Sequence, residues 1–253
     1  MTSPLHTQWL RAQRWLARHT HQRWLALPPG PGVVSFSFDD APHSACTTGR
    51  VLLEAQGCHG TWYVAGGLTD MMEEGRPCHS LDDLRALQSS GHHLACHTWA
   101  HRRCEGLDAD ALHAQWDPNR HFLANLGVPS QQMHFSFPFG AYDLRAKREA
   151  ASRFVTSRLT GGGVQVGRVD LNALRSQALY SDHIDTPTVR TLIQQTHEQG
   201  GWLIFYTHDV EDAPSRWGCT PARLQHAIAT AQELGCLVLS VEEAVAYFHA
   251  AAG

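Results

Sequence analysis

The chain has 253 residues, which suits one large α/β domain or two small ones. Hydrophobic residues make up 43% and charged residues 17%, so the chain can bury a sizeable core and global disorder is excluded. Its net charge of −4 provides no overall basic field, which argues against a nucleic-acid partner.

The first thirty residues predict an N-terminal amphipathic helical extension, separate from a domain over residues 31–253. They carry four arginines and no acidic residue, and Trp9, Leu10, Leu16, Trp24 and Leu25 are spread through them. The Trp/Leu side would pack on the domain or on a partner chain. A second interpretation is peripheral contact with an anionic membrane or a lipid-linked substrate. The segment lacks the features of a signal peptide, so we expect a cytoplasmic protein.

From residue 33 onward, short apolar runs alternate with helical patterns. The runs predict strands at 33–38, 61–64, 93–96, 133–137, 203–207 and 237–239. The intervening patterns predict helices at 45–56, 81–89, 110–126, 144–151, 187–199, 221–234 and 241–251. Alternation of this kind is typical of parallel β/α architecture. The number of units fits a β/α barrel, complete or incomplete.

Polar motifs follow four of the predicted strands. Asp39 and Asp40 end the first strand, and "HTWAH" (97–101) follows the third. "FPFGAYD" (137–143) and "YTHD" (206–209) follow two later strands. The C-terminal ends of the strands form the active-site face of β/α barrels. The sequence therefore predicts that these four motifs meet at one site.

The motifs contain the ligand types of a hydrolytic metal centre. Two histidines four residues apart on a helical turn, together with one carboxylate, can hold a single metal ion. Because the chain has 18 histidines, such a pair is expected about once by chance and is weak alone. Of two adjacent carboxylates, one could bind the metal and the other could accept a proton from water. His208 could act as a general acid, or it could be a partly buried histidine at a strand end.

These motifs resemble those of the NodB-type polysaccharide deacetylases, carbohydrate esterase family 4. "SFDD" resembles the first motif of that family, and "HTWAH" matches the second, His-Ser/Thr-x-x-His. "FPFG" is similar to the Pro-x-Gly part of the third motif, and "IFYTH" to the last. The resemblance spans about residues 33–245. It implies a deformed or incomplete β/α barrel and one divalent metal ion, with zinc as the expected ion.

The resemblance also implies a role for each motif residue. The metal ligands would be Asp40, His97 and His101. Asp39 would be the general base and His208 the general acid. The backbone N–H of Phe139 would donate to the oxyanion. The implied reaction is removal of an N-acetyl group from an amino sugar. The substrate would be an N-acetylated sugar or glycan, such as one used in O-antigen (lipopolysaccharide), capsule or exopolysaccharide biosynthesis.

Two departures from the family pattern stand out. The family has an arginine two residues before the proline of its third motif, where it pairs with the base aspartate, but this chain has Ser136 there. We expect another cation, such as Arg102, Arg103 or Arg168, to replace it, or Asp39 to be less well oriented. The family's fourth motif is not recognisable, and Asp170 is the nearest residue that could orient His208.

Three aromatic residues near the motifs are candidates for substrate contact. Trp99 lies between the two histidines of "HTWAH", Tyr142 follows the third motif, and Trp217 follows His208. For Trp99, packing beneath the metal turn is an equal alternative. Other activities also fit the sequence: deformylation or another amide hydrolysis of a lipid-linked or small substrate, or carbohydrate binding without turnover.

Overall fold

The computed structural model describes residues 15–252. Its strands are β1 (Trp24–Ala26), β2 (Val33–Asp39), β3 (Thr61–Val64), β4 (Met72–Glu73), β5 (Arg76–Pro77), β6 (His93–Cys96), β7 (Phe135–Ser136), β8 (Ser157–Thr160), β9 (Arg168–Asp170), β10 (Leu174–Ala178), β11 (Trp202–Thr207) and β12 (Leu237–Val238). Its α-helices are α2 (Arg50–Glu54), α3 (Leu81–Ser89), α4 (Ala109–Asn125), α5 (Leu144–Ala151), α6 (Thr186–Gln199), α7 (Pro221–Glu233) and α8 (Val241–Ala252), and a π-helical turn (Ala45–Gly49) precedes α2.

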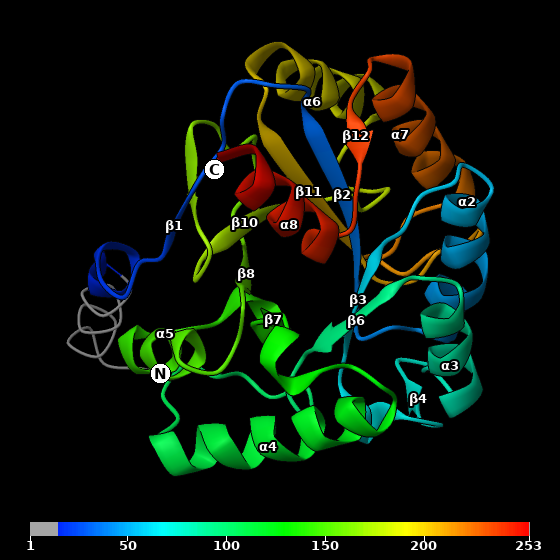
Figure 1. Ribbon diagram of the computed structural model, residues 1–253. Helices are drawn as coiled ribbons and strands as arrows, with labels where there is room; N and C mark the ends of the chain where they lie inside the picture. The colour runs from blue at the N-terminus through cyan, green and yellow to red at the C-terminus, as the bar shows by residue number, and fades with distance from the viewer. Residues whose placement is uncertain (1–14, 253) are drawn as a thin grey trace, which may run out of the picture.

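Seven parallel strands close into a barrel in the order β2-β3-β6-β7-β8-β10-β11, with β11 pairing back onto β2. Figure 1 shows the helices arranged around these strands. The barrel is deformed next to β2. Because β11 pairs with β2 from Val33 to Phe38, it occupies one whole edge of that strand. The other edge is shared by β12 at Val33–Val34 and by β3 at Ser37–Asp39. The predicted deformed (β/α) barrel is therefore confirmed.

Side chains of β2 point alternately outward, to the apolar core under the helices, and inward, to the interior of the barrel. Val34, Phe36 and Phe38 belong to the large apolar cluster between the sheet and the surrounding helices. Ser35 and Ser37 alternate with them, so they point into the barrel, because successive side chains of a strand point to opposite faces. Both serines are buried, and Ser37 donates a hydrogen bond from its hydroxyl to a backbone carbonyl of β11. The barrel interior is therefore partly polar.

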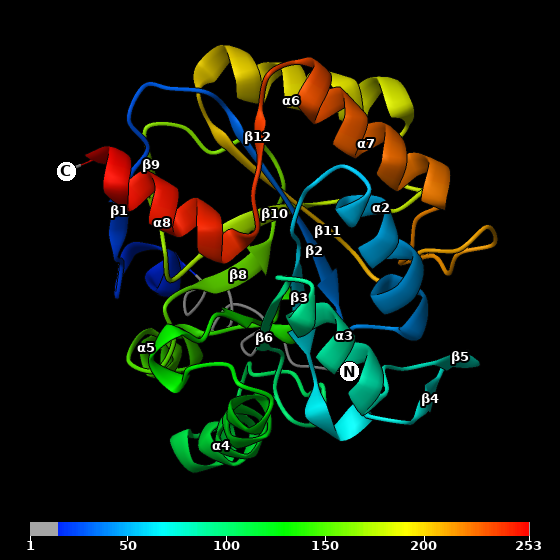
Figure 2. The ribbon, with the colours of Figure 1, turned by 45° about the vertical axis from the view of Figure 1, so that its right-hand side comes forward.

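A second apolar cluster fills the N-terminal end of the barrel. It contains Val33, Leu174 and Trp202, which are the first residues of their strands, together with Phe248 of α8. In Figures 1 and 2, α8 lies across the strands at this end of the molecule. The N-terminal end is thus closed by apolar packing, and polar side chains occupy the opposite end, as in other β/α barrels.

Most of the predicted helices are confirmed to within one or two residues. Five of them begin after a residue whose side-chain oxygen accepts a backbone N–H of the first turn: Ser80, Asp108, Asp143, Asp185 and Thr220. Such caps satisfy N–H groups that have no partner inside the helix, and each is worth about 1 kcal/mol. The sequence signal for the helix starts was therefore local and easily recognised.

The prediction of a continuous N-terminal helix is wrong at Trp24 and Leu25. Of the described residues, 15–19 are helical, but Trp24–Ala26 forms β1, which pairs antiparallel with β9. Trp24 is 46% exposed and Leu25 is 3% exposed, the alternation of a strand with one buried face. Trp9 and Leu10 lie outside the described residues.

A buried ion pair anchors this N-terminal segment to the barrel. Lys147 Nζ donates to Asp170 Oδ2 at 2.6 Å and to the carbonyl of Ala17 at 2.8 Å. Asp170 Oδ1 accepts the backbone N–H of Arg23 at 2.9 Å. Lys147 is fully buried, so these bonds compensate for the loss of water around its charge.

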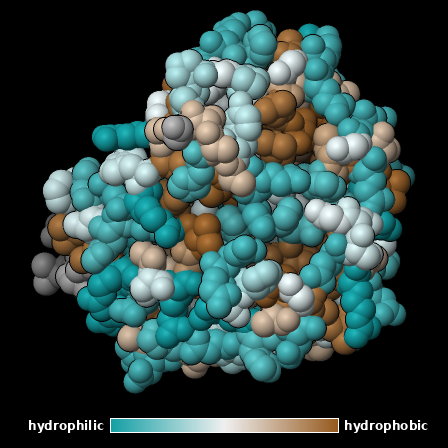
Figure 3. Space-filling model, viewed as in Figure 1, coloured by the Kyte–Doolittle hydropathy of each residue, from teal (hydrophilic) through white to brown (hydrophobic). Residues whose placement is uncertain are grey.

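The sequence did not predict β8 and β10, which complete the barrel. Both strands are rich in polar residues, and their interior-facing side chains include Arg158 and Ser176. All seven cysteines are buried and form no disulfide. Figure 3 shows a face covered mainly by hydrophilic residues. Within the described chain, no helix is both long and apolar enough to cross a membrane.

Candidate active site

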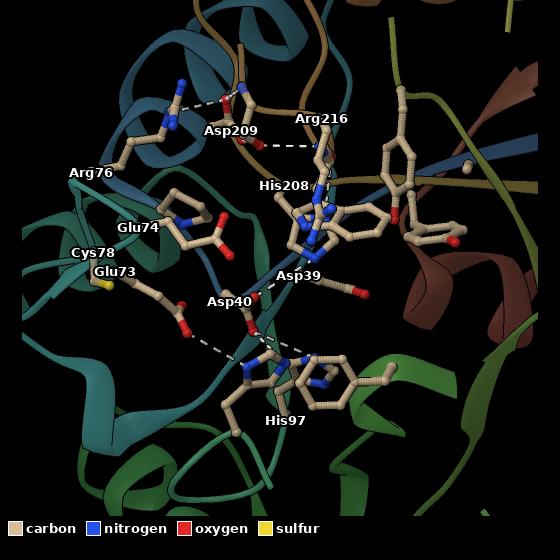
Figure 4. A pocket seen from close by; sticks show the side chains of 18 of the residues that line it. Asp39, Asp40, Glu73, Glu74, Arg76, Cys78, His97, His208, Asp209 and Arg216 are labelled. Atoms are coloured by element: carbon tan, nitrogen blue, oxygen red, sulfur yellow. Dashed lines mark hydrogen bonds and ion pairs between the residues drawn. The ribbon is translucent and has the colours of Figure 1, made fainter. Parts of the chain in front are cut away.

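A cleft of about 740 Å³ opens at the C-terminal ends of the barrel strands. Asp39, Asp40, His97, His101 and His208 all line it, as the predicted meeting of the motifs requires. In Figure 4, Asp40 lies between His97 on one side and His208 on the other. Parallel strands bring their C-terminal ends to one face, so residues that are far apart in sequence share this cleft.

Asp40, His97 and His101 form a compact group with the donor set of a metal site. One ligand atom from each lies within 4.8 Å of the other two. Asp40 Oδ1 is 3.1 Å from His101 Nε2 and 3.6 Å from His97 Nε2. Both imidazoles therefore present Nε2 to the same carboxylate oxygen.

The other ring nitrogens fix the tautomers that metal binding needs. His97 Nδ1 lies 2.8 Å from the carbonyl of Ser136, so Nδ1 carries the proton and Nε2 is left with a free lone pair. His101 Nδ1 faces the Glu73 carboxylate at 3.9 Å. An acceptor behind each ring orients it and raises its basicity as a ligand.

Burial gives this group the electrostatics of a cation site. Burial lowers the pKa of His97 to about 3, so its imidazole is neutral at neutral pH. Burial raises the pKa of Asp40 to about 6, and Asp40 Oδ1 has no hydrogen-bond partner among the described residues. A buried carboxylate oxygen without a partner costs free energy, and a bound cation would remove that cost. The three residues therefore fit a divalent metal ion.

The predicted helical turn at "HTWAH" is wrong, because residues 97–101 form an irregular loop after β6. Thr98 and His101 have φ angles of 64° and 48°. Asp40, Ala41 and Phe139 also have positive φ, between 51° and 61°. Such backbone is strained for residues other than glycine and persists where the surrounding structure enforces it. The strain lies at the three turns that carry Asp40, the histidine pair and the third motif.

Arg158 is the partner of Asp39 and supplies the cation that is missing at Ser136. It lies on β8, and its Nη2 contacts Asp39 Oδ1 and is 2.6 Å from Asp39 Oδ2. The same nitrogen is 2.6 Å from Ser136 Oγ, while Nη1 is 2.5 Å from Ser176 Oγ. The guanidinium therefore occupies the space that the short Ser136 side chain leaves free.

The guanidinium of Arg158 is held between two aromatic rings. Its central carbon is 4.8 Å from the ring centroid of Tyr63 and 4.9 Å from that of Tyr206. Arginine stacks well on aromatic faces, and the stacking fixes its plane. Asp39 thus has a rigid cationic partner.

Another cation therefore pairs with Asp39, as expected, but none of the three arginines named as examples is that cation. Arg103 lies over the ring of Phe139, and Arg168 lies over the ring of Trp24. Arg102 is exposed, and its backbone N–H donates to Thr98 Oγ1. The signal that could have identified Arg158 was an alternating run, "VTSRLT", in which Arg158 occupies an interior-facing position.

Arg158 also keeps Asp39 ionised. Burial alone would raise the pKa of the Asp39 carboxyl, but the adjacent guanidinium, together with the charges of His97 and His208, outweighs burial, and the pKa is lowered overall. An ionised carboxylate beside the metal group is able to accept a proton. Asp39 is not one of the three candidate metal ligands, so it remains available to accept a proton.

The backbone N–H of Phe139 has no acceptor among the described residues. Phe139 follows the motif proline with a φ of 60°, and its 56% exposed ring packs against the His101 ring at a centroid distance of 4.6 Å. A free backbone N–H beside the metal group is the kind of donor that stabilises a developing oxyanion.

His208 is oriented by a backbone carbonyl, and the expectation that Asp170 orients it was wrong. His208 Nδ1 lies 3.2 Å from the carbonyl of Trp217, and Nε2 lies 3.6 Å from Asp40 Oδ2. Asp170 instead uses its carboxylate to bind Lys147 and the N-terminal segment. With Nδ1 directed at a carbonyl, Nε2 is the nitrogen that faces the cleft.

Of the three aromatic candidates for substrate contact, one lines the cleft. Trp217 lines it, packing with Tyr180 at a centroid distance of 5.6 Å. Trp99 packs under the histidine loop against Phe122 of α4, and Tyr142 is buried beside Phe137. Trp99 and Tyr142 are therefore outside this cleft. Tyr180 lines the cleft and was missed, because β10 was not predicted.

We expect metal affinity to fall in acid. Since the pKa of Asp40 is about 6 in the metal-free protein, a proton competes with the metal below that pH. Titration calorimetry with Zn²⁺ should show clearly weaker binding at about pH 5 than at about pH 7. His101→Gln should weaken binding at both pH values, whereas His113→Gln, at a half-buried pair outside the cleft, should not. Equal affinity at the two pH values would contradict the assigned carboxylate ligand.

Comparison with known sequences and structures identifies the family of this chain. A sequence model of the polysaccharide deacetylase family matches residues 26–155, half of the chain. The chain therefore belongs to the polysaccharide deacetylase family. No curated protein matches it significantly.

Among solved structures, the fold is similar to a putative polysaccharide deacetylase from Mycobacterium smegmatis, with a TM-score of 0.62, 16% identity, and coverage of 88% of this chain and 92% of the other. Bacillus subtilis PdaA, a family 4 carbohydrate esterase, is similar with a TM-score of 0.59 and 14% identity, over 91% of this chain and 87% of the other. A family 4 pseudoenzyme from Bacillus anthracis is similar with a TM-score of 0.58 and 12% identity, over 86% of this chain and 66% of the other. At these identities the similarity shows the fold and does not define the substrate.

Proposed function

We propose that this protein is a metal-dependent deacetylase that removes the N-acetyl group from an amino sugar. The observation that carries the proposal is the pairing of Asp39 with buried Arg158 directly beside the Asp40–His97–His101 group. Metal binding alone would not require a second ionised carboxylate at this position. A base that accepts a proton from water does require one.

The metal would be held by Asp40, His97 and His101, and we propose zinc because these nitrogen and oxygen donors suit it. The bound ion would supply Lewis-acid activation of water and of the amide carbonyl. Each remaining chemical requirement has a candidate group in the cleft. Asp39 would accept the proton of the attacking water, and the Phe139 N–H would donate to the oxyanion.

The acid would be His208. Its Nε2 faces Asp40 across the cleft, so a proton held there could be delivered to the departing amine nitrogen. Amide nitrogen leaves poorly without protonation, which makes an acid on this side necessary. The pocket wall formed by Tyr180 and Trp217 would pack against the apolar face of the sugar ring.

We propose that the substrate serves glycan assembly, as in O-antigen, capsule or exopolysaccharide biosynthesis, with the sugar still attached to a carrier. The cleft has a volume of about 740 Å³, which accommodates one or two sugar units. The fold is compatible with several amide substrates. Assay of carrier-linked and oligomeric N-acetyl sugars is therefore needed to choose among them.

The direct test is release of acetate by the purified protein. We expect acetate from an N-acetyl sugar, loss of release after chelation, and recovery when Zn²⁺ is added back. Release of formate from a formamido sugar, with no acetate from any N-acetyl sugar, would identify a deformylase instead. Absence of metal-dependent acid release from nucleotide-linked, lipid-linked and oligomeric substrates would favour a binding protein similar to the known pseudoenzyme.

A further inference from the structure

A second groove, with a volume of about 950 Å³, adjoins the catalytic cleft. The two share Arg103, Phe139, Gly140 and Thr160 as lining residues, so they are continuous. The second groove extends from that shared edge toward β1, β9 and β10. A substrate whose acetamido group lies at the metal group could therefore extend into it.

The groove is strongly basic, although the whole chain carries a net charge of −4. Arg18, Arg103, Arg168 and Arg175 line it, and all four are exposed. Asp170 is the acidic residue among its described lining residues, and the buried Lys147 already neutralises it at 2.6 Å. The groove therefore carries an excess positive charge that the described residues do not compensate.

Nothing in the described chain pairs with these guanidinium groups. Among residues 15–252, no carboxylate forms a salt bridge with any of the four, whereas other exposed arginines, such as Arg85 and Arg148, do have acidic partners. Residues 1–14, which lie outside the described residues, contain no aspartate or glutamate in the sequence. Four arginines that line one groove without a partner give it a positive potential, which favours binding of a polyvalent anion.

Apolar surface accompanies the charge. Arg168 lies 4.2 Å from the ring centroid of Trp24, and Arg103 lies 4.6 Å from that of Phe139. Trp24 is 46% and Val166 47% exposed at the groove. Stacked guanidinium planes keep their N–H groups directed outward, where they can bind phosphate oxygens in pairs.

We propose that this groove binds the diphosphate of a sugar carrier, while the N-acetyl sugar occupies the metal cleft. This inference rests on the proposed function and names its substrate class, a sugar joined through a diphosphate diester. A neutral glycan chain would make no use of four unpaired arginines. The carrier beyond the diphosphate would be a nucleoside or a lipid, and its base or first isoprene units would lie against Trp24 and Val166.

Binding of unreactive sugar diphosphates to the metal-loaded full chain tests the proposal. The probes are uridine diphosphate glucose, farnesyl diphosphate glucose in detergent, and methyl glucoside, none of which has an amide to hydrolyse. We expect at least one diphosphate probe to bind at least about tenfold more tightly than methyl glucoside, and to weaken as salt increases. The tighter of the two diphosphates identifies the carrier. If neither binds better than methyl glucoside, the proposal is overturned.

The matched variants are Arg168→Gln/Arg175→Gln in the groove and Arg85→Gln/Arg148→Gln at exposed positions outside it. Both pairs remove two positive charges. We expect the groove pair alone to weaken diphosphate binding about tenfold or more, with both melting temperatures near that of the parent. Equal weakening by both pairs, or by neither, would overturn the site.

Activity separates this inference from the proposed function. If acetate release from a neutral N-acetyl oligosaccharide matches that from a diphosphate-linked substrate, and the groove pair leaves both unchanged, the deacetylase assignment holds and the carrier site fails. If no N-acetyl substrate is hydrolysed while the diphosphate still binds in an arginine-dependent way, the site holds and the proposed function fails.

Discussion

Replacing Asp39 with asparagine should lower kcat for acetate release by about 10²- to 10⁴-fold, the contribution typical of a positioned general base. Asparagine keeps the shape of aspartate, but it cannot accept the proton of the attacking water. Asp40, His97 and His101 are unchanged in this variant, so bound metal should stay at the level of the parent protein. Metal content and acetate release, measured on the same preparation, check the two parts of this expectation.

A control must separate the loss of the base from the loss of a buried ion pair. Asp39→Asn leaves the Arg158 charge buried without its partner, which by itself destabilises the fold. The expected signature is therefore a fall in kcat that persists at temperatures well below the melting transition, with an unchanged metal content. Turnover within a few fold of the parent would exclude Asp39 as the base.

Replacing Arg158 with methionine should be the most destabilising of the substitutions proposed here. It removes one partner of a fully buried charge pair, a change that costs about 3–5 kcal/mol of the free energy of unfolding. It should also raise the pKa of Asp39, because burial would then act without the opposing guanidinium. Asp39 must be ionised to act as a base, so the acidic limb of the pH–rate profile should move to higher pH. Chemical denaturation and a pH–kcat/KM profile measure the two effects.

The Asp39–Arg158 pair stabilises the folded protein more at neutral pH than in strong acid. The pKa of Asp39 is lower in the folded protein than its usual value, so the pair contributes stability at pH values above that usual value. That contribution is lost as the pH falls through the lowered pKa. Arg158→Met should therefore lose less stability, relative to the parent, in strong acid than at neutral pH.

A double variant tests whether Arg158 replaces the arginine of the family's third motif. Ser136→Arg with Arg158→Ser exchanges the two side chains, whose polar atoms are 2.6 Å apart in the parent. If the guanidinium serves mainly to orient and ionise Asp39, the exchange should restore part of the activity and return the acidic limb toward its parental position. Arg158→Ser alone should remain impaired. If the double variant is no better than the single one, Arg158 has a role that depends on β8 itself.

Short-range patterns in the sequence were sufficient for the helices and for most of the site. Helix starts at Ser80, Asp143 and Thr220 follow from capping side chains next to amphipathic runs, and both features are local. Asp39, Asp40 and His208 follow apolar strands, and parallel strands bring their C-terminal ends together whatever their order in the sheet. The meeting of these motifs could therefore be predicted without knowledge of the full topology.

Local patterns failed where a side chain depends on distant packing. β1 has the Trp/Leu content of an amphipathic helix, and its pairing with β9 is decided by a partner far along the chain. The histidine pair lies on a loop with positive φ angles, a conformation that no local preference favours and that the surrounding structure must enforce. Asp170 is directed to Lys147 instead of His208 because β9 lies beside the N-terminal segment.

The sequence by itself determined the alternation of strands and helices, the strand ends that carry the chemistry, and the ligand types of the metal group. Only the tertiary structure decided which cation faces Asp39, because closure of the barrel brings β8 opposite β2, with Arg158 and Asp39 119 residues apart in the chain. It also decided that Arg103 and Arg168 line a common groove beside the cleft. Periodicity and capping act between neighbours along the chain, whereas contacts across a closed barrel depend on strand order and register, which those patterns do not encode.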